Sequence, residues 1–337
     1  LAQYRDYILQ DGDILMSHIN SEKHLGKVAL YSKQDDEQII HGMNLLMLRA
    51  DTQKVIPEYA KYYFESQKFL RQIGRITKKS VNQASFTVTA LKGLEIPLAS
   101  IIVQRDISEK LKKVDWLVSL RKQQLAKLDE LVKARFVEMF GRTSLLAQNQ
   151  TKRLEECCIS ISGGNTPSMQ HPEYYGGNIP FVKSGDVKGD YIVESTLTLT
   201  KTALTETTAK ILPKSTLIVV IRSAALLKEF RIGMLMVDAV INQDLKALQV
   251  SEDFLPVYLM WAIKMQHQVL LNKVQTMLTS HIRMEDLLNL KIGTPPLSLQ
   301  DQFAAFVERV DQQKQTVQQS LEKLELMKKA LMQEYFG

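Results

Sequence analysis

The sequence predicts an α+β protein in which two mixed α/β domains are separated by an antiparallel pair of long coiled-coil helices. Three observations predict this fold class. The chain contains an internal repeat, each copy ends in a long stretch with helical periodicity, and the stretches before those helices alternate short strands with turns. We therefore divide the 337 residues into a first domain (1–101), a first helix (102–141), a second domain (142–296) and a second helix (297–337).

The repeat is clearest at its end, where LVKARFVEMFG (131–141) resembles MKKALMQEYFG (327–337). A shift of 196 residues, which carries Gly141 onto Gly337, aligns the two copies without a gap. The identities include Leu94 with Leu290, Gln104 with Gln300, Asp115 with Asp311 and Phe140 with Phe336. So many gapless identities indicate that one unit, a globular segment followed by a helix, occurs twice.

The repeat continues upstream less cleanly. IPEYAKYYFES (56–66) resembles LPVYLMWAIKM (255–265), and GDILMS (12–17) resembles STLIVV (215–220). Residue 1 then corresponds to a position near 200 in the second copy. We therefore expect an N-terminal piece of the first domain, roughly 50 residues resembling 151–200, to be absent.

The ends of both copies predict long helices. No Pro or Gly interrupts 104–140, and apolar residues recur there in steps of three and four. The apolar positions are Leu111, Val114, Val118, Leu125, Leu128, Val132 and Met139, and in the second copy Val307, Val310, Val317, Leu321, Leu324 and Leu331. Arg121, Arg135, Lys314 and Lys328 interrupt this seam. Gly141 and Gly337 follow the helices, where a left-handed cap is expected.

Each helix of about 55 Å has an apolar stripe that it cannot bury alone. Equal length and equal phase favour packing of the two helices on each other, while separate packing on two local cores is the alternative. We predict an antiparallel rather than a parallel pair, because the chain after Gly141 leads directly into the second globular segment and needs no long return.

The second globular segment is predicted to be an α+β domain. A turn-rich loop is expected at SISGGNTPS (160–168), and strands with Gly-Asp turns at NIPFVKSGDVKGDYI (178–192). KSTLIVVIRSA (214–224) and VINQDLKALQV (240–250) are each predicted as one buried strand. FLPVYLMWAIKM (254–265) predicts an amphipathic helix with Pro in its first turn.

The motifs and apolar runs of the sequence argue against a catalytic or membrane protein. No phosphate-binding loop, HExxH pair or methyltransferase motif occurs, and the six His show no ligand spacing. Cys157 and Cys158 are adjacent, without the CxxC or Cys/His cluster of a zinc site, which indicates a reducing, cytoplasmic setting. No signal peptide or membrane-length apolar run is visible. We predict a binding protein without its own metal, cofactor or active site.

A formal net charge of +6 allows a polyanionic partner without requiring one. The stretch between Gln67 and Gly93 has no Asp or Glu, and KKSVNQASF (78–86) combines lysines with amides and hydroxyls. Such residues suit phosphate and base-edge contacts, although a solvated helix face with an ordinary loop is the alternative. The DNA-binding residues predicted here are Lys78, Lys79, Asn82, Gln83 and Ser85, and in the equivalent loop TMLTSHIRMED (276–286) of the second copy Thr279, Ser280 and Arg283.

The chain resembles the specificity subunit of Type I restriction–modification enzymes. The resemblance rests on SISGGNTPS, IPFVKSGDV, VINQDLKAL and LKIGTPPLSLQDQF, with LMQEYFG at the helix end. The first copy departs from the Pro-Pro-Leu pattern and reads IPLASIIVQRDI. The resemblance covers almost the whole chain.

This resemblance implies two target-recognition domains, each of which reads one half of a split site in double-stranded DNA. It implies helices that fix the distance between the halves and dock modification subunits, which bind S-adenosylmethionine and methylate adenine, with a restriction subunit as a further partner. With this resemblance we extend the predicted DNA-binding residues to Asn165, Thr166, Ser184, Arg222, Asn242 and Gln243. We assign subunit docking to Leu125, Leu128, Leu321 and Leu324. Alternatives are a coiled-coil scaffold without DNA contact, such as a silenced truncated relative, and a stand-alone nuclease or methyltransferase.

Overall fold

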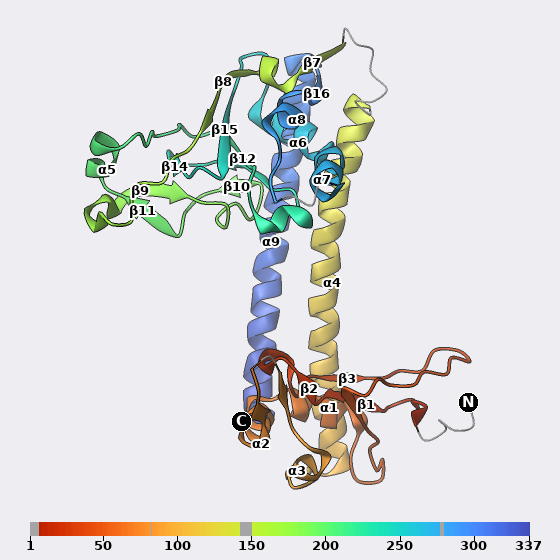
Figure 1. Cartoon of the computed structure of the whole chain (residues 1–337). Coiled ribbons are helices and arrows are strands. Elements are labelled where there is room, and N and C mark those ends of the chain that lie inside the picture. The colour runs from red at the N-terminus through yellow and green to blue at the C-terminus, as the bar shows by residue number, and fades with distance from the viewer. Residues whose placement is uncertain (1–6, 82, 142–149, 277–279) are drawn as a thin grey trace. The chain divides into compact units, whose positions relative to one another are not determined.

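A computed structural model describes residues 7–81, 83–141, 150–276 and 280–337. The chain divides into two units. Unit 1 comprises Leu1–Ala126 and Gln315–Gly337, and unit 2 comprises Lys127–Lys314. Each unit therefore contains a globular lobe and a part of both long helices, α4 (Ile101–Phe140) and α9 (Leu297–Phe336) (Figure 1).

The lobe of unit 1 is built on a three-stranded antiparallel sheet in the order β3-β1-β4 and a smaller sheet in the order β2-β6-β5. Its strands are β1 (Ile14–Ser17), β2 (Ile19–Asn20), β3 (Val28–Leu30), β4 (Leu45–Leu48), β5 (Lys78–Lys79) and β6 (Ala84–Ser85), and its helices are α1 (Pro57–Glu65), α2 (Gln67–Ile76) and α3 (Val88–Lys92). The core lies where the aromatic face of α1, with Tyr59, Tyr63 and Phe64, packs against Phe69 and Phe336.

The lobe of unit 2 contains a five-stranded sheet in the order β10-β13-β12-β15-β8, a three-stranded sheet β11-β9-β14 and the pair β16-β7 (Figure 1). Its strands are β7 (Thr151–Arg153), β8 (Cys158–Gly163), β9 (Tyr175–Val182), β10 (Tyr191–Ile192), β11 (Leu197–Leu199), β12 (Leu217–Val220), β13 (Ile232–Leu235), β14 (Val240–Ile241), β15 (Leu245–Val250) and β16 (Lys291–Gly293). Its helices are α5 (Lys201–Glu206), α6 (Pro256–Lys264), α7 (His267–Thr276) and α8 (Met284–Leu288). The α+β prediction is confirmed.

The stretch 240–250 corrects one prediction, because it is two strands and not one. β14 pairs in parallel with β9, whereas β15 pairs antiparallel with β12 and β8. A turn separates them, closed by the bond from the Leu245 N–H to the Asn242 carbonyl (3.2 Å). The Asn-Gln-Asp sequence at this turn thus moves the chain from one sheet to another.

The two helices run antiparallel, as predicted. Within unit 1, Asp115 of α4 pairs with Lys328 of α9 (2.6 Å), and Lys122 pairs with Glu325 (3.0 Å). Residues of increasing number along α4 therefore lie opposite residues of decreasing number along α9. Within unit 2 the same relation holds, since Asp129 pairs with Lys314 (2.6 Å) and the rings of Phe136 and Phe303 lie 5.3 Å apart.

The basic residues that interrupt the apolar seam serve this pairing. Burial by itself lowers the pKa of Lys314, but the hydrogen bond to Asp129 raises it above its ordinary value, so the ammonium stays charged. Lys328 pairs with Asp115, and Arg121 donates from Nε to Ser320 Oγ (3.1 Å). These contacts fix one alignment of the two helices, which apolar packing alone specifies weakly.

The two predicted glycine caps differ. Gly141 has φ +69°, the left-handed conformation expected after a helix. Gly337 does not adopt a positive φ, and its N–H continues the helical pattern to the Gln333 carbonyl (3.0 Å). The prediction of a left-handed cap at Gly337 is therefore wrong.

Equivalent hydrogen bonds in the two lobes confirm the repeat. Buried Gln104, in the first turn of α4, accepts from the Ile56 N–H (2.9 Å) and donates to the carbonyls of Lys54 and Ala99. Gln300 repeats all three bonds, accepting from Leu255 (2.8 Å) and donating to Asp253 and Pro295. Tyr59 donates to the Pro97 carbonyl, as Tyr258 does to the Gly293 carbonyl. Each helix start is thus tied to its lobe in the same way.

We predict that Gln300→Leu destabilises the protein by about 3 kcal/mol, because the buried Leu255 N–H and two carbonyls lose their partner. Urea unfolding followed by circular dichroism measures this change. Gln302→Leu, two residues away on an exposed position of the same helix, is the matched control and changes stability by about 0.5 kcal/mol or less. Equal effects of the two substitutions would contradict the proposed role of Gln300.

Candidate nucleic-acid interface

In unit 2, backbone hydrogen bonds join five chain segments that carry most of the predicted DNA-binding residues. The bonds, with the donor named first, run from Arg222 to Asp244 (3.2 Å), from Ser223 to Ser280 (2.9 Å), from Asn242 to Val182 (3.1 Å) and from Asn165 to Ile241 (3.2 Å). The polar stretches of the sequence therefore form one surface, which we call the unit 2 polar surface, although up to 118 residues separate them.

The turn after β14 holds the charged part of this surface. The Arg222 guanidinium is 64% exposed and lies 4.0 Å from the Asp244 carboxylate. Asn242 donates from Nδ2 to the same carboxylate (3.0 Å). Asn242 is only 6% exposed, so its assignment to DNA binding stays a prediction. Its side chain orients Asp244, which in turn lies beside Arg222.

A second part of the surface follows β8. Asn165 donates from Nδ2 to Thr208 Oγ1 (2.6 Å), and the Thr166 hydroxyl hydrogen-bonds Gln243 Oε1. Gly164 allows this approach, because a Cβ there would lie 2.0 Å from the Ile241 carbonyl oxygen. The glycine is needed for close backbone packing, which holds Asn165 and Gln243 at the surface.

The other predicted residues of unit 2 lie at the edges of this surface. Ser184 is half-buried in the turn after β9, which the Asp186 carboxylate closes by accepting from the Lys183 N–H (2.9 Å). Ser280 and Arg283 are exposed, Ser280 beside Ser223 and Arg283 immediately before α8. Thr279 lies outside the described residues.

A cleft of about 720 Å³ borders this surface, lined by Ser160, Ser162, Gly163, Gly164, Asn165, Thr208, Lys210, Ile211, Leu212, Ile241 and Gln249. Lys210 is exposed at its wall, and the Lys246 ammonium lies over Gly163, 2.7 Å from where a Cβ would be. Sequence reasoning missed both lysines. Neither stands in a basic cluster of the sequence, and only the β8–β15 pairing brings Lys246 opposite Gly163, two residues before Asn165.

In unit 1 the predicted residues lie on the β5–β6 hairpin. Lys78, Lys79 and Gln83 are exposed and Ser85 is half-buried, whereas Asn82 lies outside the described residues. The Ser80 N–H and hydroxyl both donate to the Gln83 carbonyl (2.8 Å each) and close the hairpin. Lys79 also pairs with Glu22 (2.7 Å). Lys78 is the cation of this hairpin that makes no ion pair within the described residues.

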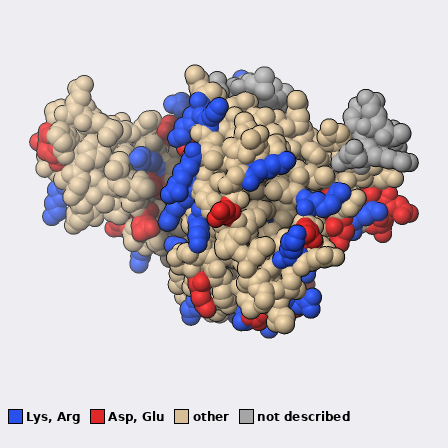
Figure 2. All heavy atoms as spheres, turned by 90° about the horizontal axis from the view of Figure 1, so that it is seen from below, with Lys and Arg blue, Asp and Glu red and all other residues tan. Residues whose placement is uncertain are grey.

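The helix before this hairpin adds positive charge. Lys68, Arg71 and Arg75 of α2 are exposed, and within the described ranges none of them makes an ion pair. Figure 2 shows a row of Lys and Arg side chains on this face, with few acidic side chains among them. Such a row attracts a polyanion at long range without reading its sequence.

The four leucines assigned to subunit docking lie along the helices. Leu128 and Leu321 are only 9% and 6% exposed, and Leu125 and Leu324 are half-buried. Their first role is therefore packing within the helix pair, and a contact with another subunit stays a prediction. The more exposed apolar side chains of the helices include Trp116 (59%), Leu131 (46%), Leu326 (68%) and Met327 (51%).

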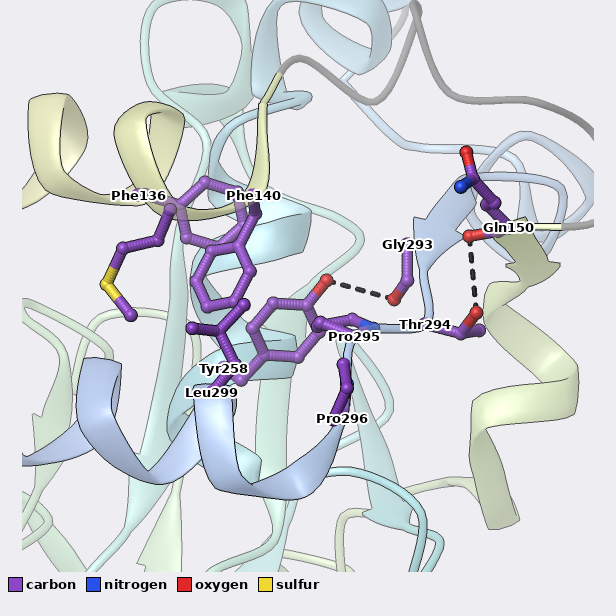
Figure 3. Close-up of a pocket in the computed structure, with 10 residues that line it drawn as sticks. Phe136, Phe140, Gln150, Tyr258, Gly293, Thr294, Pro295, Pro296 and Leu299 are labelled. Carbon is purple, nitrogen blue, oxygen red and sulfur yellow. Dashed lines mark hydrogen bonds between the residues drawn. The ribbon is translucent and has the colours of Figure 1, made fainter.

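The described residues contain no cluster of His, Cys, Asp and Glu that could hold a metal ion. A cavity of about 290 Å³ in unit 2 is lined by Phe136, Phe140, Tyr258, Pro295 and Pro296 among others (Figure 3). Its polar groups are already paired, since Tyr258 donates to Gly293 and Thr294 donates to Gln150. This cavity therefore has packing character and not the paired acid and base of a catalytic site. Across the described part of the chain, no helix combines the length and hydrophobicity of a membrane span.

Comparisons with known proteins agree with the resemblance seen in the sequence. The sequence model of the family described as Type I restriction modification DNA specificity domain matches residues 1–130 and 148–326. A protein of Methanocaldococcus jannaschii, described as a type I restriction enzyme MjaX specificity subunit, is 39% identical over 142 residues. That match covers 42% of this chain and 32% of the relative.

The Escherichia coli EcoR124I/EcoR124II specificity subunit is 26% identical over 152 residues, which cover 44% of this chain and 38% of the relative. The matches thus span about a third of the length of each relative. Two solved structures are similar over 98% of this chain, each with a TM-score of 0.58. One comes from a study of type I R-M system assembly (17% identity, 82% of that chain covered), and the other is the S subunit from M. genitalium (15%, 85% covered). They support the fold.

We predict that the adjacent cysteines resist alkylation in the folded protein. Burial raises the pKa of Cys157 to about 12 and that of Cys158 to about 11, and only a thiolate attacks iodoacetamide. At neutral pH, mass spectrometry should find both alkylated far more slowly than in urea-unfolded protein. The native rate should rise about tenfold per pH unit and keep rising to about pH 11, where the unfolded thiols are already ionised. Equal rates in native and unfolded protein at neutral pH would contradict this prediction.

Proposed function

This chain belongs to the family of Type I restriction modification DNA specificity domains, and we propose that it reads a bipartite DNA site for an adenine methyltransferase complex. In this proposal the lobe of each unit reads one half of the site, and the chain performs no catalysis itself. S-adenosylmethionine is bound by separate modification subunits. The setting is the cytoplasm, where DNA and reduced thiols are both found.

The observation that supports two readers is the recurrence of one backbone arrangement with different side chains. The His18 N–H donates to the Asn44 carbonyl (3.2 Å), as the Ile221 N–H does to Asp244 (2.9 Å). The Phe86 N–H donates to the His18 carbonyl (3.2 Å), as Ile282 does to Ile221 (2.8 Å). The same set of backbone hydrogen bonds, which we call the frame, therefore supports one surface in each lobe.

The side chains on this frame differ in chemistry. Where unit 2 presents Arg222 and Gln243, the equivalent positions of unit 1 carry Ile19 and Met43. Arg and Gln form paired hydrogen bonds with guanine and adenine edges, whereas apolar groups contact the thymine methyl. Two lobes with these differences favour two unlike half-sites, each good contact contributing about 1–3 kcal/mol of discrimination.

Attraction to the DNA backbone comes from the exposed cations. These cations, all exposed, are Lys68, Arg71, Arg75 and Lys78 in unit 1 and Lys210 in unit 2. Each phosphate neutralised this way releases counterions, so binding weakens as salt rises. This electrostatic attraction does not depend on the DNA sequence, and it positions the lobes for base contacts.

Docking of the modification subunits is proposed on the helices α4 and α9. Leu125, Leu128, Leu321 and Leu324 shape the apolar packing there, and the exposed Trp116 supplies an anchor of the size that interface hot spots favour. At 59% exposure, most of the Trp116 side chain is available for such a contact.

A second candidate function is a scaffold that docks partner subunits without reading DNA. The partly buried apolar residues of the unit 1 sheet, such as Leu30 and Leu48, favour it, because an apolar face suits a protein contact better than a phosphate contact. The two functions differ in one measurement, which is salt-dependent binding to a specific DNA site in the presence of the modification subunits.

We predict that Arg222→Gln weakens binding to the cognate DNA by about 1–3 kcal/mol and relaxes specificity in one half-site. Fluorescence anisotropy with the assembled methyltransferase complex measures the affinity across a salt series. Arg309→Gln, the same charge change at an exposed position of α9, is the control. The proposal for Arg222 fails if both variants lose affinity equally for all DNA sequences.

We predict that exchanging residues 150–293 for the corresponding segment of a relative changes one half of the methylated motif and leaves the other unchanged. The reason is that this segment contains the whole unit 2 lobe, with its polar surface, and none of the unit 1 lobe. Single-molecule sequencing of adenine methylation in cells reads out both halves together. A change in both halves would refute the assignment of one half-site to each unit.

We predict that Trp116→Ser reduces co-purification of the modification subunits about tenfold or more, since interface Trp residues often contribute 2 kcal/mol or more. Ile159→Ser, which removes an apolar side chain of similar exposure (72%) from the unit 2 lobe, is the control. Retained assembly in the Trp116 variant would move the docking surface elsewhere on the helices.

A further inference from the structure

One row of side chains crosses the small sheet of unit 1. Ile19 of β2 lies opposite Ser85 of β6, and Ser85 in turn lies opposite Lys78 of β5. Residues that lie opposite each other on neighbouring antiparallel strands present their side chains on the same face of the sheet. Lys78 is exposed, whereas Ile19 and Ser85 are half-buried. A cation, a hydroxyl and an apolar side chain therefore follow one another on one face.

An exposed methionine borders this row. Met43 is 88% exposed, in the turn that precedes β4. The next residue, Asn44, accepts at its carbonyl from the N–H of His18, the residue before Ile19 (3.2 Å). This backbone bond holds the turn against the start of β2. Met43 and Ile19 are therefore apolar neighbours of the same bond, and Met43 is the one open to solvent.

The position of Met43 faces outward in both lobes. A backbone bond closes the turn before β4 (3.0 Å) as another closes the turn before β15 (3.2 Å), and Met43 and Gln243 occupy the same place in these two turns. Both side chains are exposed. The bridge between Arg222 and His281 likewise corresponds to the pairing of β2 with β6. The exposure of Met43 is thus a property of the shared backbone arrangement.

The chemistry of the two side chains selects one group on DNA. Neither Met43 nor Ile19 carries a strong hydrogen-bond donor or acceptor, so neither gains from the donors and acceptors of the base edges. The apolar group that the major groove offers is the C5-methyl of thymine. The Lys78 ammonium in the same row favours DNA over an apolar protein surface as the occupant, because it attracts a phosphate.

We propose that the unit 1 lobe reads an A·T pair through the C5-methyl group of its thymine. Met43 makes the contact with Ile19 beside it, and Lys78 and Ser85 bind a neighbouring phosphate. This inference rests on the proposed function, in which each lobe reads one half of the site, and it assigns a base pair to one of the two halves.

The experiment replaces the thymines of the cognate DNA one at a time by deoxyuridine, which lacks only the C5-methyl group. The exchange of residues 150–293 described above identifies the half-site that belongs to unit 1. Fluorescence anisotropy with the assembled methyltransferase complex then measures the affinity at one salt concentration. We expect one deoxyuridine in that half-site to weaken binding about fourfold, which is the effect of exposing one buried methyl group.

Met43→Gln, which introduces the residue type of the equivalent unit 2 position, should remove the difference between thymine and deoxyuridine. Met236→Gln, the same change at an exposed methionine of unit 2 (45%), is the matched control and should keep the difference. A loss of affinity with deoxyuridine that persists in Met43→Gln would assign the effect to DNA shape and overturn the proposal. A unit 1 half-site without an A·T pair would overturn it as well.

Failure of this inference is distinguishable from failure of the proposed function. A complex that binds its site specifically, but shows no effect of deoxyuridine at any thymine of the unit 1 half-site, would overturn the role of Met43 and leave the proposed function in place. Absence of specific DNA binding would overturn both.

Discussion

The buried glutamine in the first turn of each long helix is the constraint on which the architecture depends. Gln104 and Gln300 are each 0% exposed, and each satisfies one N–H and two carbonyls from three places in its lobe. An amide is the side chain that both accepts and donates in this pattern. Because these bonds are buried, the start of each helix has a fixed direction relative to the lobe that precedes it.

The far end of each helix completes the lobe of the other copy. Phe336, at the end of α9, packs on Tyr59 (5.3 Å between ring centroids) in unit 1. Phe140, at the end of α4, packs on Tyr258 (4.8 Å) in unit 2. Neither repeat can therefore close its own core, and the similar helix endings of the sequence have a common physical cause. The same reciprocity requires the antiparallel arrangement.

Periodicity predicted the helices and their pairing because those features depend on local spacing and on matched length. The outcome for single polar residues could not be predicted in the same way. Asn242 and Gln243 are neighbours in the sequence, yet one is buried under the Asp244 turn and the other is exposed. Lys246 lies opposite Gly163, two residues before Asn165, only because β15 pairs with β8. Exposure of these residues follows from sheet topology, which the sequence pattern does not encode locally.

The separation of backbone and side-chain roles explains how one frame can serve two different surfaces. The bonds that join Ile221 to Asp244, and His18 to Asn44, use backbone atoms of the donor and acceptor alone. Side chains at the neighbouring positions 19 and 222 are then free to differ without loss of the frame. Substitution there changes the presented chemistry at little cost in stability, whereas substitution at Gln300 disturbs the frame itself. Positions whose side chains do not hold the fold can therefore differ between the two copies, whereas positions whose side chains do hold it stay the same.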